Sequence, residues 1–383
     1  MTRFPDVAEQ ISAIIRSHSD VTEADRQIAQ PVIDAIRSTP LPRMTLAKID
    51  GGQAMPLPDV LLVYERLARE DAAVAWVLWN SGLVTFFSRF MSPELRSEVF
   101  GHPEALFCQS TRPMGTAEKT PEGHAISGRW SLVSGCNHAD WAFLTCFAQQ
   151  DGSPVIEPSG MPRMLIAALP KNQFETVDTW HSSGLRGTGS HDVIVDRVNV
   201  PEHRIFQIGP HQPRDIYDRV PIMSAVTAIF AAQVLGVTQA VCDHLRHRGK
   251  TEITPGPMPD LRDRPETLVG LASHWAALNA ARLGLHAAAG KVWQLAEAGQ
   301  SVDEAPITEL YAASMHAMAI AKSAMADLHA FAGTKALYTA SPIERRNRDL
   351  QAMLRHIVAQ PSMLADVGRS LFGAAPEWPP YSV

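Results

Sequence analysis

The sequence predicts an α+β protein in which a β-rich segment separates two helical segments. Apolar residues recur at three- and four-residue spacing up to about Glu104, which is the period of an amphipathic helix. Short apolar runs separated by turn residues follow from Ala105 to about Phe206, and helical periodicity returns after Pro213. We expect an N-terminal helical domain at 1–104, a β domain at 105–208 and a helical bundle at 209–383.

Composition limits the classes of function. The 383 residues include 34 Lys and Arg against 40 Asp and Glu, with no basic tract, so neither nucleic acid nor membrane is an expected partner. The four cysteines show no CxxC spacing, which argues against a disulfide framework or a zinc site and makes the cytoplasm the expected compartment. Charged residues are only 19% of the chain, which favours surface buried between subunits.

One uncharged run, from Val220 to Cys242, is long enough to cross a bilayer. It is rich in alanine and interrupted by polar side chains, which is more typical of a helix buried in a bundle. We therefore expect a core helix there. The polar residues are Ser224, Thr227, Gln233, Thr238 and Gln239.

The strand and helix patterns indicate the architecture of the two larger segments. Six or so short strands without helical crossovers indicate an antiparallel barrel or sandwich. Four long helical segments joined by short loops indicate an up-down four-helix bundle. We expect these helices at about 221–248, 266–298, 306–332 and 341–359.

Three local sequences narrow the fold class to one family. Residues 128–141 read GRWSLVSGCNHADW, with a Ser-Gly turn between two strands. Residues 184–192 read GLRGTGSHD and lead into the strand VIVDRVNVP. Residues 341–350 read SPIERRNRDL, in which Ser341 is a suitable N-cap and Pro342 a suitable first helical residue. These stretches resemble the acyl-CoA dehydrogenase superfamily, and within it the two-component monooxygenases that take reduced flavin from a separate reductase.

The resemblance covers nearly the whole chain and implies an acyl-CoA dehydrogenase-like fold with reduced FMN or FAD as the cofactor. It also implies O2 and an aromatic or apolar small molecule as substrates, a separate flavin reductase, and a homotetramer or dimer whose subunits complete each other's flavin sites. We expect a catalytic role for Ser134 in addition to its contact with the flavin. The flavin contacts implied on the first strand end and the Ser-Gly turn are Gln109, Ser110, Trp130, Ser131 and Ser134.

The same residues also have structural interpretations. Trp130 could be an ordinary core residue, and the glycines of 184–192 are what any tight loop needs. The loop is not a dinucleotide-binding fingerprint, because Asp192 stands where the third glycine should be and a strand follows instead of a helix. We expect Gly187 and Thr188 to shape the flavin and substrate cavity.

The resemblance further implies a catalytic histidine at His356. We expect the last long helix to carry Asp349, Met353, His356 and Gln360 on one face. A histidine of near-neutral pKa there could hold or deliver the proton that oxygen activation needs, or deprotonate a phenolic substrate. A lone helical histidine is otherwise more often structural.

A missing carboxylate separates the two branches of the superfamily. A dehydrogenase needs a base, generally glutamate, to remove the acyl α-proton. The resemblance places that base near His356 or Ile357, or near Val226, and none of these residues is acidic. The expected function is therefore a flavin-dependent monooxygenase, or hydroxylase. The alternatives are an acyl-CoA dehydrogenase or oxidase with FAD and a non-standard base, and a scaffold that keeps only the fold.

Two further pairs belong to the expected site. Several members of the oxygenase branch carry a histidine just after the Trp-containing N-terminal helix, where this chain has Asn80 and Ser81. We assign these two residues to the substrate pocket. Arg348 and Asp349, which form the R-D signature, are assigned to the cofactor site.

Basic residues near the end of the helix predicted at 221–248 give two more hypotheses. Arg246 and Arg248 could pair with a flavin phosphate, or they could simply be cations favoured by the helix C-terminus. His244 and His247 lie one turn apart, but no carboxylate follows at a matching spacing. We expect no metal site.

Overall fold

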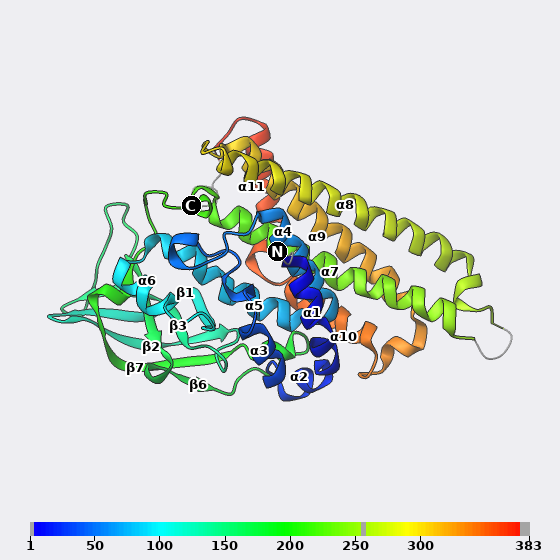
Figure 1. Ribbon diagram of the computed structural model, residues 1–383, viewed down its shortest axis with the longest axis horizontal. Coiled ribbons are helices and arrows are strands. Elements are labelled where there is room, and N and C mark those ends of the chain that lie inside the picture. Colours follow the sequence, from blue (N-terminus) through cyan, green and yellow to red (C-terminus); the bar gives the residue numbers. More distant parts are fainter. Residues whose placement is uncertain (1–3, 254–257, 376–383) are drawn as a thin grey trace.

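The computed structural model describes residues 4–253 and 258–375. One β-sheet lies beside helices from both ends of the chain, and the long C-terminal helices extend away from it (Figure 1). The chain thus has the mixed helix and sheet content that the sequence predicts. The N-terminal helices are α1 (Phe4–Ser17), α2 (Ser19–Asp25), α3 (Gln30–Arg37), α4 (Leu57–Glu70), α5 (Ala72–Phe87) and α6 (Pro93–Phe100).

Helix α5 is the buried centre of the N-terminal helices. Nearly all of its side chains are apolar and buried, and it contacts α4, the sheet and the C-terminal helices. A helix that is apolar on every side is stable only in an interior. Asp71 begins the helix, because its carboxylate accepts the free backbone N–H groups of Ala73 and Val74.

The strands form one open sheet in the order β6-β7-β2-β1-β3-β5-β8, with β4 paired to β3. The predicted closed barrel or sandwich is therefore wrong. The expectation of purely antiparallel pairing is also wrong, because β1 and β3 run parallel with Phe107 beside Trp141. The strands are β1 (Phe107–Thr120), β2 (Gly123–Val133), β3 (Trp141–Gln150), β4 (Ser153–Pro154), β5 (Met164–Pro170), β6 (Glu175–Val177), β7 (His191–Pro201) and β8 (Ile205–Phe206).

Strand β1 is long and continues to Thr120 through Pro113 and Gly115, which are residue types common in turns. Gly115 lies inside it, where a Cβ atom would come within 2.2 Å of the Trp130 ring. Gly128 on the neighbouring strand is required for the same reason, at 2.8 Å from that ring. These two glycines make room for a buried tryptophan inside the sheet.

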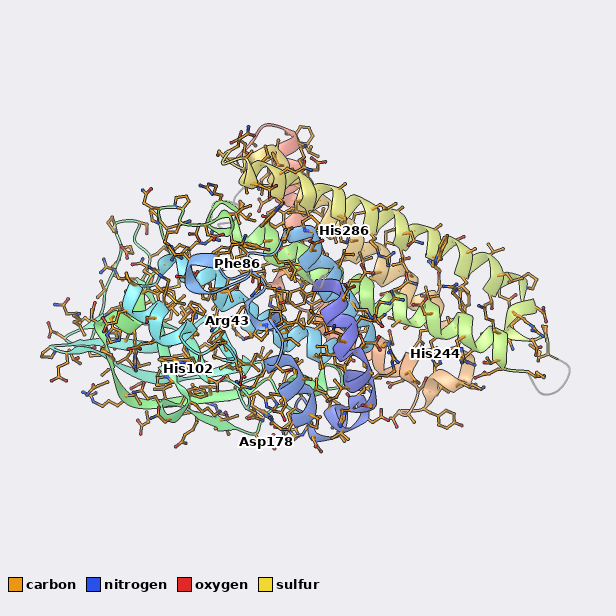
Figure 2. All side chains as sticks on the ribbon, in the orientation of Figure 1. Arg43, Phe86, His102, Asp178, His244 and His286 are labelled. Carbon is orange, nitrogen blue, oxygen red and sulfur yellow. The ribbon has the colours of Figure 1, made fainter. Side chains whose placement is uncertain are left out.

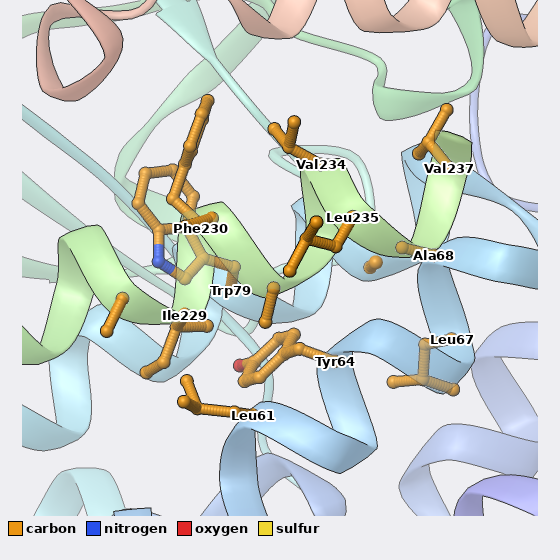
Figure 3. Close-up of a cluster of buried hydrophobic side chains, with 14 of the residues drawn as sticks. Leu61, Tyr64, Leu67, Ala68, Trp79, Ile229, Phe230, Val234, Leu235 and Val237 are labelled. Atoms are coloured by element: carbon orange, nitrogen blue, oxygen red, sulfur yellow. The ribbon is translucent and has the colours of Figure 1, made fainter. Parts of the chain in front are cut away.

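The C-terminal helices are α7 (Ile222–Thr251), α8 (Pro265–Glu297), α9 (Glu304–Phe331), α10 (Pro342–Met353) and α11 (Ser362–Leu371). Helix α7 is long and apolar enough to cross a membrane by length and composition, and its most apolar stretch is completely buried inside the protein. It packs on α4, where Tyr64 lies beside Ile229 and Leu235 (Figure 3). Gly236 permits this approach, because a Cβ atom there would lie 2.3 Å from the Glu65 carbonyl oxygen.

The last predicted helix is shorter than expected, and a further helix follows it. Helix α10 ends at Met353, so His356 and Gln360 do not share one helical face with Asp349. His356 has an extended backbone, with φ −65° and ψ 149°, and begins a short 3-10 turn at Ile357–Ala359. Helix α11 then packs against α9.

Candidate active site

His356 lies in a cluster of aromatic rings from two helices. Its ring centroid is 5.5 Å from that of Trp76 and 5.3 Å from that of Trp79, both on α5, in edge-to-face contact. Phe230 of α7 stacks on it at 5.7 Å. Such contacts fix the orientation of the imidazole without giving it a charged neighbour.

Burial makes His356 a neutral imidazole. Loss of hydration lowers its pKa from 6.5 to about 4, which corrects the expected near-neutral value. Its Nδ1 accepts the Val358 backbone N–H at 3.4 Å. Since Nδ1 is an acceptor, the ring proton is on Nε2, and His356 presents a neutral hydrogen-bond donor.

A chain of hydroxyl groups begins at the edge of this cluster. The Trp76 indole N–H donates to Ser134 Oγ at 3.0 Å. Ser134 Oγ lies 2.7 Å from Ser190 Oγ, which lies 2.6 Å from Thr188 Oγ1. Thr188 Oγ1 donates to the Leu185 carbonyl oxygen at 2.8 Å. The fold thus brings together two predicted residues, Ser134 and Thr188, through Ser190, which the sequence analysis did not select.

The predicted residues Asn80 and Gln109 form a second polar link beside α5. The Asn80 amide donates to the Trp76 carbonyl oxygen at 3.0 Å, and the Gln109 amide donates to Asn80 Oδ1 at 3.1 Å. Ser81 Oγ accepts the Phe107 backbone N–H at 3.0 Å, which attaches α5 to β1. Ser110 is buried next to Gln109 on β1. The side-chain oxygen of Gln109, Oε1, is buried and has no partner among the described residues.

Asp349 and Arg348 hold the glycine-rich loop. Asp349 Oδ1 accepts the Leu185 backbone N–H at 2.6 Å, while Arg348 donates to the Ser183 carbonyl oxygen. Burial outweighs the attraction of Arg345 and raises the pKa of Asp349 to about 7. A Cβ atom on Gly184 would lie 2.2 Å from the Arg348 carbonyl oxygen. In this chain the R-D signature is a clamp on the loop, not a converging part of the His356 cluster.

Arg345, which the sequence analysis did not select, extends the clamp to α5. Its guanidinium donates to Asp71 Oδ2 at 2.7 Å and to Ser19 Oγ at 2.8 Å. Asp71 is the N-cap of α5, so one turn of α10 fixes both the loop and the helix that carries Trp76. The spacing of Arg345 and Asp349, four residues on a helix, was the available signal.

Gly187 also has a packing role. A Cβ atom there would lie 2.3 Å from Thr22 Cγ2 and 3.1 Å from the Ala73 Cβ atom. Its missing side chain therefore lets the loop approach α2 and α5. Gly187 thus faces other protein atoms and not a cavity. The neighbouring Thr188 belongs to the hydroxyl chain.

Trp130 is a core residue of the sheet. It has no exposed surface, and its indole N–H donates to the Thr145 carbonyl oxygen at 2.8 Å, so no part of it is free to contact a ligand. Ser131 is partly exposed and donates to Met114 Sδ at 3.7 Å. No role was predicted for Leu132, which follows Ser131. Leu132 is 54% exposed, and its backbone has a φ of +62°.

Arg246 and Arg248 do not converge with the other candidates. Figure 2 shows His244, just before them on α7, near the far end of the bundle from the sheet. Eighteen residues separate Phe230 from Arg248, about 27 Å of helix. Arg248 pairs with Glu252 at 3.0 Å. Within one chain, neither arginine can reach a mononucleotide beside His356.

Comparison with known proteins finds relatives along nearly the whole chain. Residues 228–361 match the family described as acyl-CoA dehydrogenase, C-terminal domain. The indole-3-acetate monooxygenase of Pseudomonas putida is 29% identical over 366 residues, covering 94% of this chain and 92% of the relative. The flavin-dependent monooxygenase oxygenase subunit HsaA of Rhodococcus jostii is 25% identical, covering 91% of this chain and 92% of the relative. XiaF from Streptomyces, solved with FADH2 and glycerol, superposes with a TM-score of 0.89 at 23% identity, covering 98% and 96% of the two chains.

The chain is thus similar over nearly its whole length to flavin-dependent monooxygenases, and its residues 228–361 are similar to the C-terminal domain of acyl-CoA dehydrogenases. The missing dehydrogenase base agrees with this branch. Val226 is a buried apolar residue of α7, and Ile357 is a partly exposed apolar residue after α10. Among the described residues, none that contacts the His356 ring is a carboxylate.

The residues of the candidate site fit a flavin ring. The polar edge of an isoalloxazine needs hydrogen-bond donors and acceptors, and its faces need apolar or aromatic surface. Gln109 Oε1 is a buried acceptor, and Trp79 Nε1 a buried donor, without a partner among the described residues. Ser134, next to the aromatic cluster, is 5% exposed. The donor set of the described site is thus suited to a flavin.

Proposed function

We propose that the chain hydroxylates an aromatic small molecule, using O2 and FMN or FAD in the reduced form, at the junction of α5, the β2–β3 turn and the segment after α10. The observation that carries the proposal is the position of Trp76. One ring contacts His356 and also donates a hydrogen bond to Ser134. Trp76 would thus belong both to an aromatic pocket that excludes water and to the polar edge that binds the flavin.

Each polar residue would have a distinct task. Gln109 and Ser134 would hold the polar edge of the ring, with Ser110 beside them. Asn80 keeps Gln109 in place and fixes it to α5. When bound, reduced flavin supplies the two electrons with which one atom of O2 enters the substrate and the other becomes water.

His356 would act as a neutral group that holds a proton on Nε2. Its low pKa means that it donates a hydrogen bond at pH 7 without bringing a positive charge into the pocket. The surrounding indole and phenyl rings exclude water from the imidazole, which limits loss of the activated oxygen as hydrogen peroxide. This role needs the tautomer that the Val358 backbone N–H selects.

The substrate class follows from the walls of the site. Trp76 and Trp79 keep a small exposed fraction, and their rings favour a flat aromatic compound. Relatives named for indole-3-acetate, resorcinol and p-hydroxyphenylacetate support the same class. Relatives that use FADH2 and a solved relative that holds FMN support either flavin.

We further propose a separate flavin reductase as partner, a homotetramer or dimer, and a cytoplasmic location without nucleic-acid or membrane partners. Relatives are named as oxygenase components, which supports the reductase. Exposed apolar side chains on α8 support an assembly of subunits; these are Leu268, Val269, Trp275 and Leu283. The absence of a basic tract and the four free, buried cysteines support the location.

The deciding experiment supplies reduced FMN or FADH2 from an unrelated reductase and offers a panel of indole and phenol acids under isotopically labelled O2. A product with one labelled oxygen is expected, with little hydrogen peroxide. His356→Asn should shift the balance from product to peroxide, whereas the same change at His286, a partly buried histidine of α8, should not. The proposal fails if no compound is labelled and an acyl-CoA instead bleaches bound FAD. That result would favour a dehydrogenase with a non-standard base.

A further inference from the structure

The hydroxyl chain that starts at Trp76 can run in only one direction. A carbonyl oxygen only accepts, so the single Thr188 hydroxyl proton is committed to the Leu185 oxygen at 2.8 Å. The contact of 2.6 Å between Thr188 and Ser190 must then use the Ser190 proton. The contact of 2.7 Å between Ser190 and Ser134 must in turn use the Ser134 proton.

This order leaves Ser134 as an acceptor. Its only proton points to Ser190, and one of its two lone pairs takes the Trp76 indole N–H at 3.0 Å. The second lone pair remains for a further donor. Ser134 therefore offers an outside group a hydrogen-bond acceptor and no donor.

The end of the hydroxyl chain at Leu185 is held by further hydrogen bonds. The Leu185 carbonyl oxygen also accepts the Trp180 indole N–H at 2.9 Å, and its amide is held by Asp349 at 2.6 Å. Leu185 itself has φ +52°, an unfavourable conformation for leucine that this set of contacts maintains. These contacts hold the Leu185 oxygen next to the Thr188 hydroxyl, which favours this order of protons.

We propose that Thr188 and Ser190 are positioning residues that make the site prefer reduced over oxidised flavin by fixing Ser134 as an acceptor. Reduced isoalloxazine carries an N–H group at a ring nitrogen that has only a lone pair in the oxidised ring. An acceptor bonds the first and repels the second. The inference rests on the proposed function, because it takes Ser134 as a contact of the flavin.

The test measures the dissociation constants of reduced and oxidised flavin, anaerobically, for the whole protein. Thr188→Val keeps the shape of threonine but removes the acceptor of Ser190, so Ser190 can donate to Ser134 and free the Ser134 proton. The preference for reduced flavin should fall about tenfold, one hydrogen bond's worth. The midpoint potential of bound flavin should fall by about 30 mV, because that is a tenfold change for a two-electron couple.

Three further variants separate this effect from a general loss of packing. Thr188→Ser keeps the hydroxyl and should retain the wild-type preference. Ser190→Ala should reduce the preference, while Ser314→Ala, a buried serine of α9, should leave it unchanged. The inference is overturned if Thr188→Val and Ser190→Ala weaken both redox states equally. If the wild-type protein binds neither flavin, the proposed function itself is wrong.

Discussion

The Trp76 indole donates to Ser134 Oγ at 3.0 Å and meets the His356 ring at 5.5 Å. Trp76 belongs to α5, Ser134 to the turn after β2, and His356 to the segment after α10. One side chain thus connects the three parts of the chain that supply the candidate site. This junction and the clamp formed by α10 hold the candidate site together.

Replacing Trp76 tests the bond to Ser134. Trp76→Phe keeps an aromatic ring but removes the N–H donor, and it should lower the free energy of unfolding by about 1 kcal/mol more than Trp79→Phe. Trp79 is the matched control, because its buried N–H has no partner among the described residues. Urea unfolding of the two variants measures the difference. Equal losses would mean that the bond contributes nothing.

His356 should make stability depend on pH. Its pKa is about 4 in the folded protein and 6.5 when hydrated, so only the unfolded chain binds a proton between these values. This contribution to stability is complete above about pH 6.5 and is lost as the pH falls towards 4. Between pH 7 and 5, wild type should lose about 2 kcal/mol more than His356→Asn, whose amide can still cap the 3-10 turn. Parallel pH profiles in denaturant titrations would contradict the low pKa.

Asp349 should make stability depend on pH in the opposite direction. Burial raises its pKa from 3.8 to about 7, so the folded protein keeps a proton that the unfolded chain has already released. Wild type should therefore lose stability relative to Asp349→Asn as the pH rises from 4 to 7. Asp349→Ala should cost about 2 kcal/mol, because it leaves the Leu185 amide buried without an acceptor. Thermal and urea unfolding at several pH values distinguish these effects; an Ala variant as stable as the Asn variant would rule out the clamp.

Gly184 tests the close approach of the loop to α10. Gly184→Ala should cost about 2 kcal/mol, because its Cβ atom would lie 2.2 Å from the backbone oxygen of Arg348, which cannot move aside freely. Gly209→Ala is the control, since nothing lies within 4 Å of a Cβ atom there. Flavin binding should weaken together with stability in the first variant alone. An unchanged unfolding midpoint would show that the loop can shift without loss.

Local patterns predicted the parts of the chain that local forces decide. Helical periodicity predicted the helices on both sides of the β segment. A helix that buries one face, or its whole surface, has apolar residues at regular spacing along the sequence. The end of α10 was missed, because the His356 ring leaves the helical path for aromatic partners on α5 and α7.

The sequence by itself determined the order of helices and strands, the resemblance to a flavin enzyme family, and the absence of a carboxylate where a dehydrogenase needs one. Only the tertiary structure decided that the sheet is open, that β1 and β3 run parallel, and that Trp130 is a core residue. It also revealed the bond from Arg345 to Asp71, between residues 274 positions apart, and the hydroxyl chain through Ser190. Periodicity records which face of an element is buried, whereas pairing between distant elements and the direction of a hydrogen bond depend on which groups the fold brings within 3 Å.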